Sequence, residues 1–546
     1  MAGSTKVEPD HARDHSDDTK EKKSPEAGMT GFLGFIEKIG NKLPDPFWLF
    51  VILAAIVAVS SAIAARAGLS ATDPANGEEI HVESLLTAEN LSRMVTDAVQ
   101  NFVAFPPLGV ILAVMLGVAV AEQSGLLSAM IRAMVSKVNP KMLTFMVALA
   151  GVTGSVASDA IFVILIPLGA MAFHAMGRSP VVGAMVAFAA SSAGFNASLI
   201  LNITDLLLAG ISTSAAQLVD EAYEVSPLAN IFFVIPSAIV LSLIVTAVTE
   251  FFVDKKASAL VDHDEIDEDE LEFDEENEPD DAHKKDDDSL ELTPLENKGL
   301  KWAGVTLIVF FIAYFALLFV PGSPFARPEE GFMESPLIRA IAVPITLMFF
   351  VTGLVYGLIV KTIDDPADIP SFMAKGLESL LPILVLFFAV AQFLAWFQWS
   401  NLGSWTAIKG AELLQRWDLP TVVLFAAFVL MVTLINLFIT SGSAQWALMA
   451  PVVVPMMMYV DVSPEVTQML YRIGDSPSNI ITPMSPYFAL ALTFLQKYYK
   501  KAGVGTLMSL ALPYTVTILI GWFLFFLVWY YAGIPLGPGS PMGYEL

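Results

Sequence analysis

Residues 471–479 read YRIGDSPSN and guide the interpretation of the whole chain, because they place Arg472 and Asp475 between two apolar runs, 442–462 and 480–494. Side chains three positions apart on a helix share a face, so this arginine and aspartate could form an ion pair. At the depth of hydrocarbon an ionisable side chain costs at least about 2.5 to 3.5 kcal/mol, and it must face protein, water or a ligand. The glycine and proline of the same stretch would open the helix and free backbone groups to bind an ion.

The composition of the chain is that of a membrane protein. Its 546 residues are 55% hydrophobic and only 15% charged, and the mean hydropathy is +0.64, a balance that soluble domains do not reach. Several segments of about 20 residues carry almost no charge, which is the length of helix that crosses roughly 30 Å of hydrocarbon. We therefore expect an all-α polytopic protein of the cell (plasma) membrane, surrounded by the lipid bilayer.

Long apolar runs predict nine transmembrane helices. Two of them, at 181–219 and 464–496, are interrupted by polar residues and are expected to be broken helices. The other seven are expected near 47–68, 106–122, 228–253, 299–321, 337–360, 377–399 and 506–532.

Two further apolar regions have small and polar residues at their centres, where a simple span would be most apolar. The halves of the first, near 142–176, are separated by GSVASD, and the halves of the second, near 420–459, are separated by SGS. Irregular backbone at membrane depth is stable only where it is buried in protein or lines a wet cavity. We therefore predict two re-entrant hairpins.

The hairpins have matching landmarks. Ser155 lies 12 residues before Pro167, and Ser443 lies 12 residues before Pro455. Each hairpin is followed by an interrupted span, which contains SAGFNASLILNITD in the first half and GDSPSNIITPMSP in the second. Inverted repeats with broken helices are typical of secondary transporters, whose binding sites lie at the repeat interface.

Lysine and arginine in the short loops predict the orientation. Lys38 and Lys42 precede the first span, whereas the loop 69–105 holds one arginine and several acidic residues, and chiefly Lys409 and Arg416 disagree with the resulting count. The N-terminus is therefore predicted to be cytoplasmic and the C-terminus extracytoplasmic. The same count places the two hairpins on opposite sides of the membrane, as an inverted repeat requires.

An acidic linker is predicted to join the two halves. Residues 254 to 296 contain 20 Asp and Glu against 4 Lys, and the formal net charge of the chain is -26. This composition is typical of a disordered tether, and a regulatory or partner-binding segment is the alternative. The predicted order is a polar cytoplasmic tail and lead-in at 1–45, a first repeat at 46–253, the linker at 254–297, a connecting helix and loop at 298–335, a second repeat at 336–535 and a C-terminal tail at 536–546.

Four polar side chains of the second half are candidates for the binding site. Arg472 offers a planar donor fork that suits a carboxylate. Asp475 and Asn479 offer hard oxygen ligands of the kind that a sodium ion accepts, and Asp475 could instead take up a proton. Asn436 is expected to be buried and to need a partner, and we include it among the sodium ligands.

The first half supplies polar residues at the corresponding interruption, namely Asn196, Ser198, Asn202 and Asp205. Asn196 is predicted to bind substrate. Asp205 has no base near it in the sequence, which predicts a protonatable or cation-binding carboxylate, with a plain loop position at the end of a half-helix as the alternative. Asp159 is a weaker candidate that could instead cap the following helix.

The hairpin tips are predicted to contact substrate through Ser155 and Ser443. Trp446 lies three residues after Ser443. It is expected either to mark the membrane interface or to stack on a flat ligand.

Other chemistry finds little support in the sequence. The chain has no cysteine, which excludes disulfides and thiolate metal sites. It lacks an HExxH zinc motif, a P-loop and a Rossmann glycine pattern, so we expect neither an enzyme nor an ATP-driven pump. Apart from a sodium ion we expect no cofactor, and we expect no nucleic-acid partner.

Four stretches resemble signatures of the AbgT family, the p-aminobenzoyl-glutamate transporters. They are GSVASDAIFVILIPLGAMAFHAMGRSP, LLAGISTSAAQ, SGSAQWALMAPVVVPMM and YRIGDSPSNIITPMSPYFAL. With the span layout, the resemblance covers about residues 30–535. It implies a homodimer of subunits with nine transmembrane helices and two hairpins, with a scaffold, a mobile transport core and coupling to a cation gradient.

The resemblance also implies roles for particular residues. Asn436 and Asn479 are similar to cation ligands of the family. The other matching functional positions are Asp205, Ser443, Trp446, Pro464, Arg472, Asp475 and Pro483. The acidic linker is atypical, so the match of Asp205 depends on its local context.

The expected function is secondary transport of p-aminobenzoyl-glutamate or related aromatic carboxylates. Export of p-aminobenzoate and sulfonamide antimetabolites is the alternative that the family implies. A passive anion channel lined by the same charges is an alternative from a different class, and an intramembrane enzyme is a third. Import and export, and sodium and proton coupling, are equally compatible with the sequence.

Overall fold

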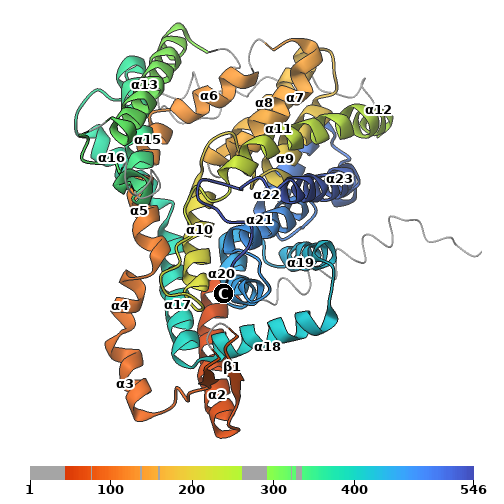
Figure 1. Ribbon diagram of the computed structural model, residues 1–546. Helices are drawn as coiled ribbons and strands as arrows, with labels where there is room; N and C mark the ends of the chain where they lie inside the picture. Colours follow the sequence, from red (N-terminus) through yellow and green to blue (C-terminus); the bar gives the residue numbers. More distant parts are fainter. Residues whose placement is uncertain are drawn as a thin grey trace, which may run out of the picture.

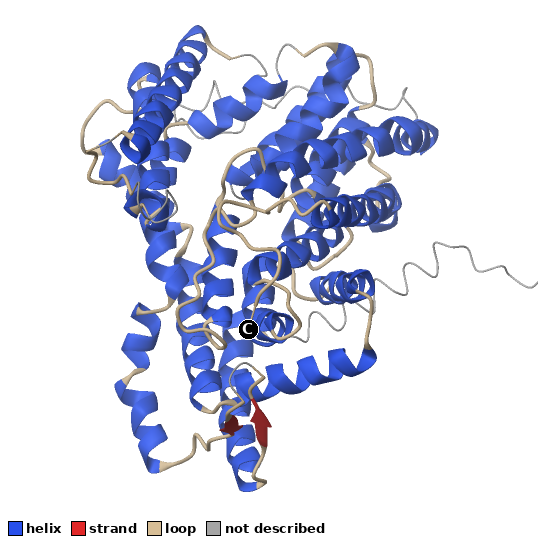
Figure 2. Cartoon of the chain, viewed as in Figure 1, coloured by secondary structure: helices blue, strands red, loops and turns tan. Residues whose placement is uncertain are grey.

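The computed structural model describes residues 44–74, 77–135, 138–157, 160–260, 292–320, 322–327 and 335–545 (Figure 1). The predicted tail before residue 44, most of the acidic linker and the candidate Asp159 lie outside these residues. The described chain is helical apart from one antiparallel pair of short strands, β1 (Ser70–Thr72) and β2 (Glu79–His81) (Figure 2).

Seven of the described helices are long and apolar enough to cross a membrane, and each coincides with a predicted continuous span. The helix at 231–248 continues as a π-helix, η3 (Thr249–Val253), and as α12 (Asp254–Leu260). The seven are α2 (Pro46–Arg66), α5 (Pro106–Gln123), α11 (Ile231–Val248), α13 (Pro294–Phe319), α15 (Ala342–Val360), α17 (Leu381–Trp399) and α23 (Val504–Tyr531).

The two interrupted spans are broken helices. In the first half, α9 (Pro180–Ala193) and α10 (Ile203–Ala216) are separated by nine non-helical residues, 194–202. In the second half, α21 (Pro464–Asp475) passes into a 3-10 turn, η7 (Ser476–Ile480), and the chain becomes helical again at α22 (Pro486–Tyr498). Pro477 and Pro483 lack the N–H that a continuous helix would need, which explains the break.

Each predicted hairpin is a pair of short apolar helices. In Figure 1 the first hairpin lies in the upper half of the view and the second in the lower half. The first consists of α7 (Leu143–Thr153), the 3-10 turn η2 (Gly154–Ala157) and α8 (Ala160–Ala175), and the second of α19 (Thr421–Asn436) and α20 (Gly442–Met458).

Several shorter helices lie where the sequence predicted loops, and one more, at 336–339, lies at the start of the span predicted near 337–360. The helix at 402–417 carries the two basic residues that disagreed with the charge count, and both pair with Glu412. These helices lack a long apolar run, so a search for spans does not find them. They are α3 (Ala88–Thr96), α4 (Ala98–Val103), α6 (Leu126–Val135), α14 (Pro336–Arg339), α16 (Asp368–Glu378) and α18 (Leu402–Trp417), with the 3-10 turn η1 (Pro140–Met142) before α7.

The helices form two groups that lie side by side (Figure 1). In one group α5 packs on α15 and α16, α13 packs on α15, and α2 packs on α17. Close approach requires Gly117 of α5, because a Cβ there would overlap the backbone of Thr346. The other group contains both hairpins and both broken helices, and α10 connects the groups by packing on α5 as well as on α20.

Candidate functional site

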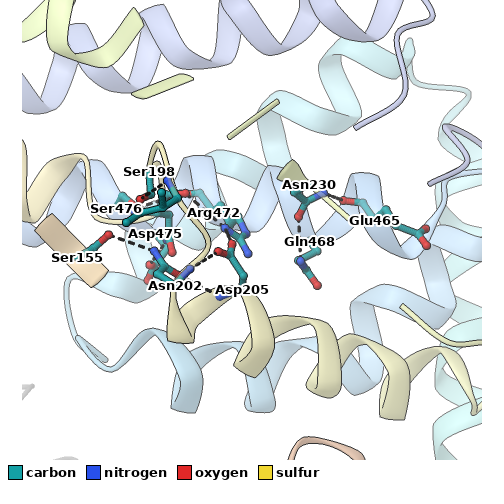
Figure 3. Close-up of polar contacts among 12 residues, drawn as sticks. Ser155, Ser198, Asn202, Asp205, Asn230, Glu465, Gln468, Arg472, Asp475 and Ser476 are labelled. Atoms are coloured by element: carbon teal, nitrogen blue, oxygen red, sulfur yellow. Dashed lines mark hydrogen bonds and ion pairs between the residues drawn. The ribbon is translucent and has the colours of Figure 1, made fainter. Parts of the chain in front are cut away.

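A buried ion pair joins the two broken helices. Arg472 of α21 lies with a guanidinium nitrogen 2.6 Å from a carboxylate oxygen of Asp205 in α10, and the two residues are 1% and 5% exposed. Figure 3 shows both side chains at the centre of a polar cluster. The sequence suggested Asp475 as the partner of Arg472 and a base-free environment for Asp205. Both expectations were wrong, because helix packing brings together residues from opposite halves of the chain.

Asp205 is held in place by the start of its own helix. It is the third residue of α10, and it forms a capping box in which its Oδ2 accepts from the N–H of Asn202 and the Asn202 side chain accepts from the N–H of Asp205. A carboxylate at this position is also stabilised by the helix dipole. Asn202 donates its side-chain amide to Ser155 at 3.1 Å, so the first hairpin tip is tied to the same cluster.

Asp475, the last residue of α21, is linked to the ion pair through Asn196, whose backbone oxygen lies 3.4 Å from a guanidinium nitrogen of Arg472. It is 1% exposed, and its Oδ2 accepts from the amide of Asn196 at 2.8 Å. The hydroxyl of Tyr471 lies 2.6 Å from the carbonyl oxygen of Gly442 and 3.2 Å from Oδ1 of Asp475. A hydroxyl has one hydrogen, and the shorter contact favours donation to Gly442. Oδ1 of Asp475 then faces a lone pair of the Tyr471 hydroxyl oxygen. This arrangement favours either a protonated Asp475 carboxyl group or a cation bound near Oδ1.

Asn436 lies at the last residue of α19 among several oxygen atoms. Its amide nitrogen, which carries two hydrogens, lies within 2.9 Å of three acceptors: the carbonyl oxygen of Asp475, Oγ of Ser478 and Oδ1 of Asn479. Its own buried Oδ1 has no hydrogen-bond partner among the described residues. The helix break thus gathers these three oxygens around the Asn436 amide nitrogen, with the unpaired Asn436 Oδ1 and the carboxylate of Asp475 nearby, and oxygen donors of this kind suit a hard cation such as sodium.

A cavity of about 230 Å³ lies between the hairpins and the broken helices. The residues at its wall come mostly from helix ends rather than from helix middles. Phe162, Thr204, Gly442 and Pro486 lie in the first turns of α8, α10, α20 and α22. The described lining is Phe162, Ser192, Phe195, Asn196, Thr204, Leu207, Leu208, Ile383, Thr440, Ser441, Gly442, Ser443, Tyr471, Asp475, Asn479, Ser485, Pro486 and Tyr487.

The predicted site residues divide into two sets. Asn196, Ser443, Asp475 and Asn479 line the cavity. The predicted site residues that do not line it are Ser155, Asp205, Asn436, Trp446, Pro464, Arg472 and Pro483. No group of three or more His, Cys, Asp or Glu that could hold a metal ion occurs within the described ranges.

Trp446 is fully buried on α20. Its indole N–H donates to Oγ of Ser212 at 3.0 Å, and its ring packs against Tyr471 at a centroid distance of 4.5 Å. The tryptophan therefore supports the wall of the cavity through Tyr471. In this conformation it presents no face to the cavity.

The sequence analysis missed a second polar cluster, which extends from Trp446 along α21. Ser212 donates to Gln468 at 2.7 Å. Gln468 in turn donates to Asn230 at 2.8 Å, and Asn230 donates to the backbone oxygen of Glu465 at 3.0 Å (Figure 3). The carboxylate of Glu465 accepts from the hydroxyl of Tyr223 at 2.9 Å. A sequence signal did exist, since positions 465, 468, 472 and 475 form a polar stripe with helical spacing.

Two hairpins that both contribute to one cavity, broken helices and buried charges at the breaks define a membrane transporter of the broken-helix type. Residues 31–544 match the sequence pattern of the AbgT putative transporter family. The chain belongs to this family, and the family expectation is confirmed, as is the expectation that the chain is not an enzyme.

Relatives of known description agree with this membership. The chain is 37% identical over 518 residues to the p-aminobenzoyl-glutamate transport protein of Escherichia coli (strain K12). The matched region covers 94% of this chain and 98% of that protein. The YdaH transporter of Alcanivorax borkumensis has a similar structure, with a TM-score of 0.81 and 38% identity, covering 91% of this chain and 100% of that one. MtrF of Neisseria gonorrhoeae, described with a class of antimetabolite efflux pumps, gives a TM-score of 0.85 and 42% identity, covering 93% and 100%.

Proposed function

We propose that this chain is a secondary active transporter of p-aminobenzoyl-glutamate or related aromatic carboxylates, driven by a sodium or proton gradient. The observation that carries the proposal is the arrangement of helix ends around the cavity. Among the described residues, the starts of α8, α10, α20 and α22 line it, and the last residues of α19 and α21 lie at or directly behind its wall.

The helix N-termini at the cavity are proposed to bind the anionic part of the substrate. The first turn of a helix has unpaired backbone N–H groups and a partial positive charge, and both favour a carboxylate. Ser443 of α20 and Ser485 before α22 add hydroxyl groups at the same wall. Arg472 stays a predicted substrate contact, although in this conformation its charge is committed to Asp205.

The C-terminal ends of α19 and α21 are proposed to bind the coupling ion. The last carbonyl groups of a helix carry partial negative charge, and in transporters unwound carbonyls and such ends hold sodium or a proton. Asn436 and Asp475 occupy these positions in α19 and α21, with Ser478 and Asn479 beside them. We therefore propose that the cation binds between Asp475 and the side-chain oxygens of Asn436, Ser478 and Asn479.

Asn196 is proposed to orient the substrate. It lines the cavity and donates to Asp475, while its buried Oδ1 has no partner among the described residues. An unpaired buried acceptor costs about 1–3 kcal/mol, which a donor on the substrate would offset. The amino group of p-aminobenzoate and of p-aminobenzoyl-glutamate is such a donor.

Export of p-aminobenzoate and sulfonamides is the second candidate function, and the similarity to MtrF favours it. Both directions would use the same cavity. We also propose a cytoplasmic N-terminus, an extracytoplasmic C-terminus and a homodimer. The mostly exposed apolar helix α13, with only 11% of its most apolar window buried, offers a surface for lipid or for a second subunit.

Flux in proteoliposomes tests the proposal. Labelled p-aminobenzoyl-glutamate and p-aminobenzoate would be supplied with sodium and proton gradients imposed separately in each direction. We expect one of the two gradients to drive accumulation of at least one substrate against its own concentration gradient. Flux that only equalises concentrations would identify a passive channel, and an altered mass of the transported compound would identify an enzyme.

A further inference from the structure

Two aromatic rings close one side of the cavity. Phe162 of α8 and Tyr487 of α22 are stacked with a centroid distance of 3.9 Å and an interplanar angle of 10°. Phe162 follows the first hairpin tip, and Tyr487 lies in the second part of the second broken helix, so the pair connects the two halves of the chain. Both residues line the cavity.

The described lining has two other aromatic side chains, the half-buried Phe195 in the break between α9 and α10 and Tyr471 of α21, and Tyr471 is less available for stacking. Tyr471 is buried, its ring is covered by Trp446, and its hydroxyl is engaged at Gly442. Tyr487 is only half-buried, and it is the second residue of α22. Its ring therefore lies directly beside the backbone N–H groups that we assign to the carboxylate.

This juxtaposition matches the shape of an aromatic carboxylate. In such a molecule the ring is joined to the acid group or lies a few bonds from it, and the cavity offers two aromatic side chains next to a helix start. We infer that Phe162 and Tyr487 form the subsite that recognises the aromatic ring of the substrate. The inference rests on the proposed function and adds the residues that distinguish an aromatic from a saturated carboxylate.

The test compares two ligands that differ only in aromaticity. Benzoate and cyclohexanecarboxylate would compete against labelled p-aminobenzoate on the purified, detergent-solubilised full chain. Stacking and edge contacts of aromatic rings predict a benzoate preference of about 2- to 12-fold in Kd. This comparison uses the unmodified chain, so it does not depend on the folding of any variant.

Substitutions then test whether Phe162 and Tyr487 cause the preference for benzoate. Phe162→Leu and Tyr487→Leu should reduce it by weakening benzoate and leaving cyclohexanecarboxylate unchanged, while Tyr487→Phe should retain it. Phe525→Leu is the matched control, because Phe525 is half-buried and stacked on Phe233 away from the cavity. Size-exclusion chromatography and thermal unfolding would establish that each variant is folded.

The outcomes separate the inference from the proposed function. Binding of p-aminobenzoate to the unmodified chain without any benzoate preference would overturn the aromatic subsite and leave the transporter proposal standing. A preference that both leucine variants retain would also overturn it. Failure of the unmodified chain to bind or transport p-aminobenzoate and p-aminobenzoyl-glutamate would overturn the proposed function, and the subsite with it.

Discussion

Removing one partner of the Arg472–Asp205 pair should destabilise the fold more than removing both. The pair is almost fully buried, and its nearest atoms are 2.6 Å apart. Asp205→Asn leaves the arginine as an uncompensated buried charge, which costs about 3–5 kcal/mol. The same change weakens the capping box of α10, since the N–H of Asn202 would no longer donate to a charged acceptor.

The double variant Asp205→Asn, Arg472→Gln removes both charges, so no unpaired charge remains buried. We expect it to recover at least 1 kcal/mol relative to the sum of the single variants, which is a coupling typical of residues in contact. The assay is thermal unfolding in detergent, completed as a double-mutant cycle. Glu412→Gln is the control, because its partners Lys409 and Arg416 lie on an exposed surface and the expected cost is about 0–1 kcal/mol.

Additive costs in this cycle would refute the reasoning. Additivity within about 0.5 kcal/mol is the behaviour of independent sites, and it would mean that the two side chains are not paired in the folded membrane protein. A cost of Asp205→Asn no larger than that of Glu412→Gln would lead to the same conclusion.

Three other substitutions examine the remaining parts of the site. Asp475→Asn should abolish the dependence of transport on the cation gradient, and retention of full sodium or proton dependence in proteoliposomes would reject that role. Gly474→Ala places a Cβ 2.7 Å from the carbonyl oxygen of Val429, so α19 and α21 must separate. We expect the free energy of unfolding to fall by about 1–3 kcal/mol. An unchanged midpoint of thermal unfolding would contradict the close approach. Glu465→Ala leaves the Tyr223 hydroxyl without its acceptor and should cost about 1–3 kcal/mol, whereas Glu465→Gln should cost less; equal costs would show that this hydrogen bond is unimportant.

The sequence predicted the helical elements better than it predicted the partners within the site. Long apolar runs and the polar interruptions at 194–202 and 474–486 are local signals, and each corresponds to a helix or a break in the structure. The pairing of Arg472 with Asp205 has no local signal, because it depends on how α10 packs against α21. The proximity of Asp475 to Arg472 along the helix instead suggested a contact that the fold does not use.

The position of Trp446 shows a similar limit. Tryptophan beside a hairpin tip is compatible with a ligand contact, with a membrane interface and with a buried role, and only the neighbouring helix decides among them. Ser212 of α10 accepts the indole N–H, which turns the ring toward Tyr471. Phe162 and Tyr487 were not predicted because each is an ordinary aromatic residue in an apolar run, and their stacking connects opposite halves of the chain.

The close approach of Gly442 to Asp475 explains how ion and substrate could depend on one another in the proposed mechanism. A Cβ on Gly442 would lie 3.3 Å from Oδ2 of Asp475, so the tip of the second hairpin rests directly on the carboxylate. Tyr471 holds the same tip through the Gly442 carbonyl. A proton or cation that changes the charge or position of Asp475 would therefore act on the hydrogen bond between Tyr471 and the Gly442 carbonyl, next to Ser443 at the cavity wall. Because the first turn of α20 is also a proposed carboxylate site, cation binding and anion binding would share one structural element, which is what reciprocal coupling requires.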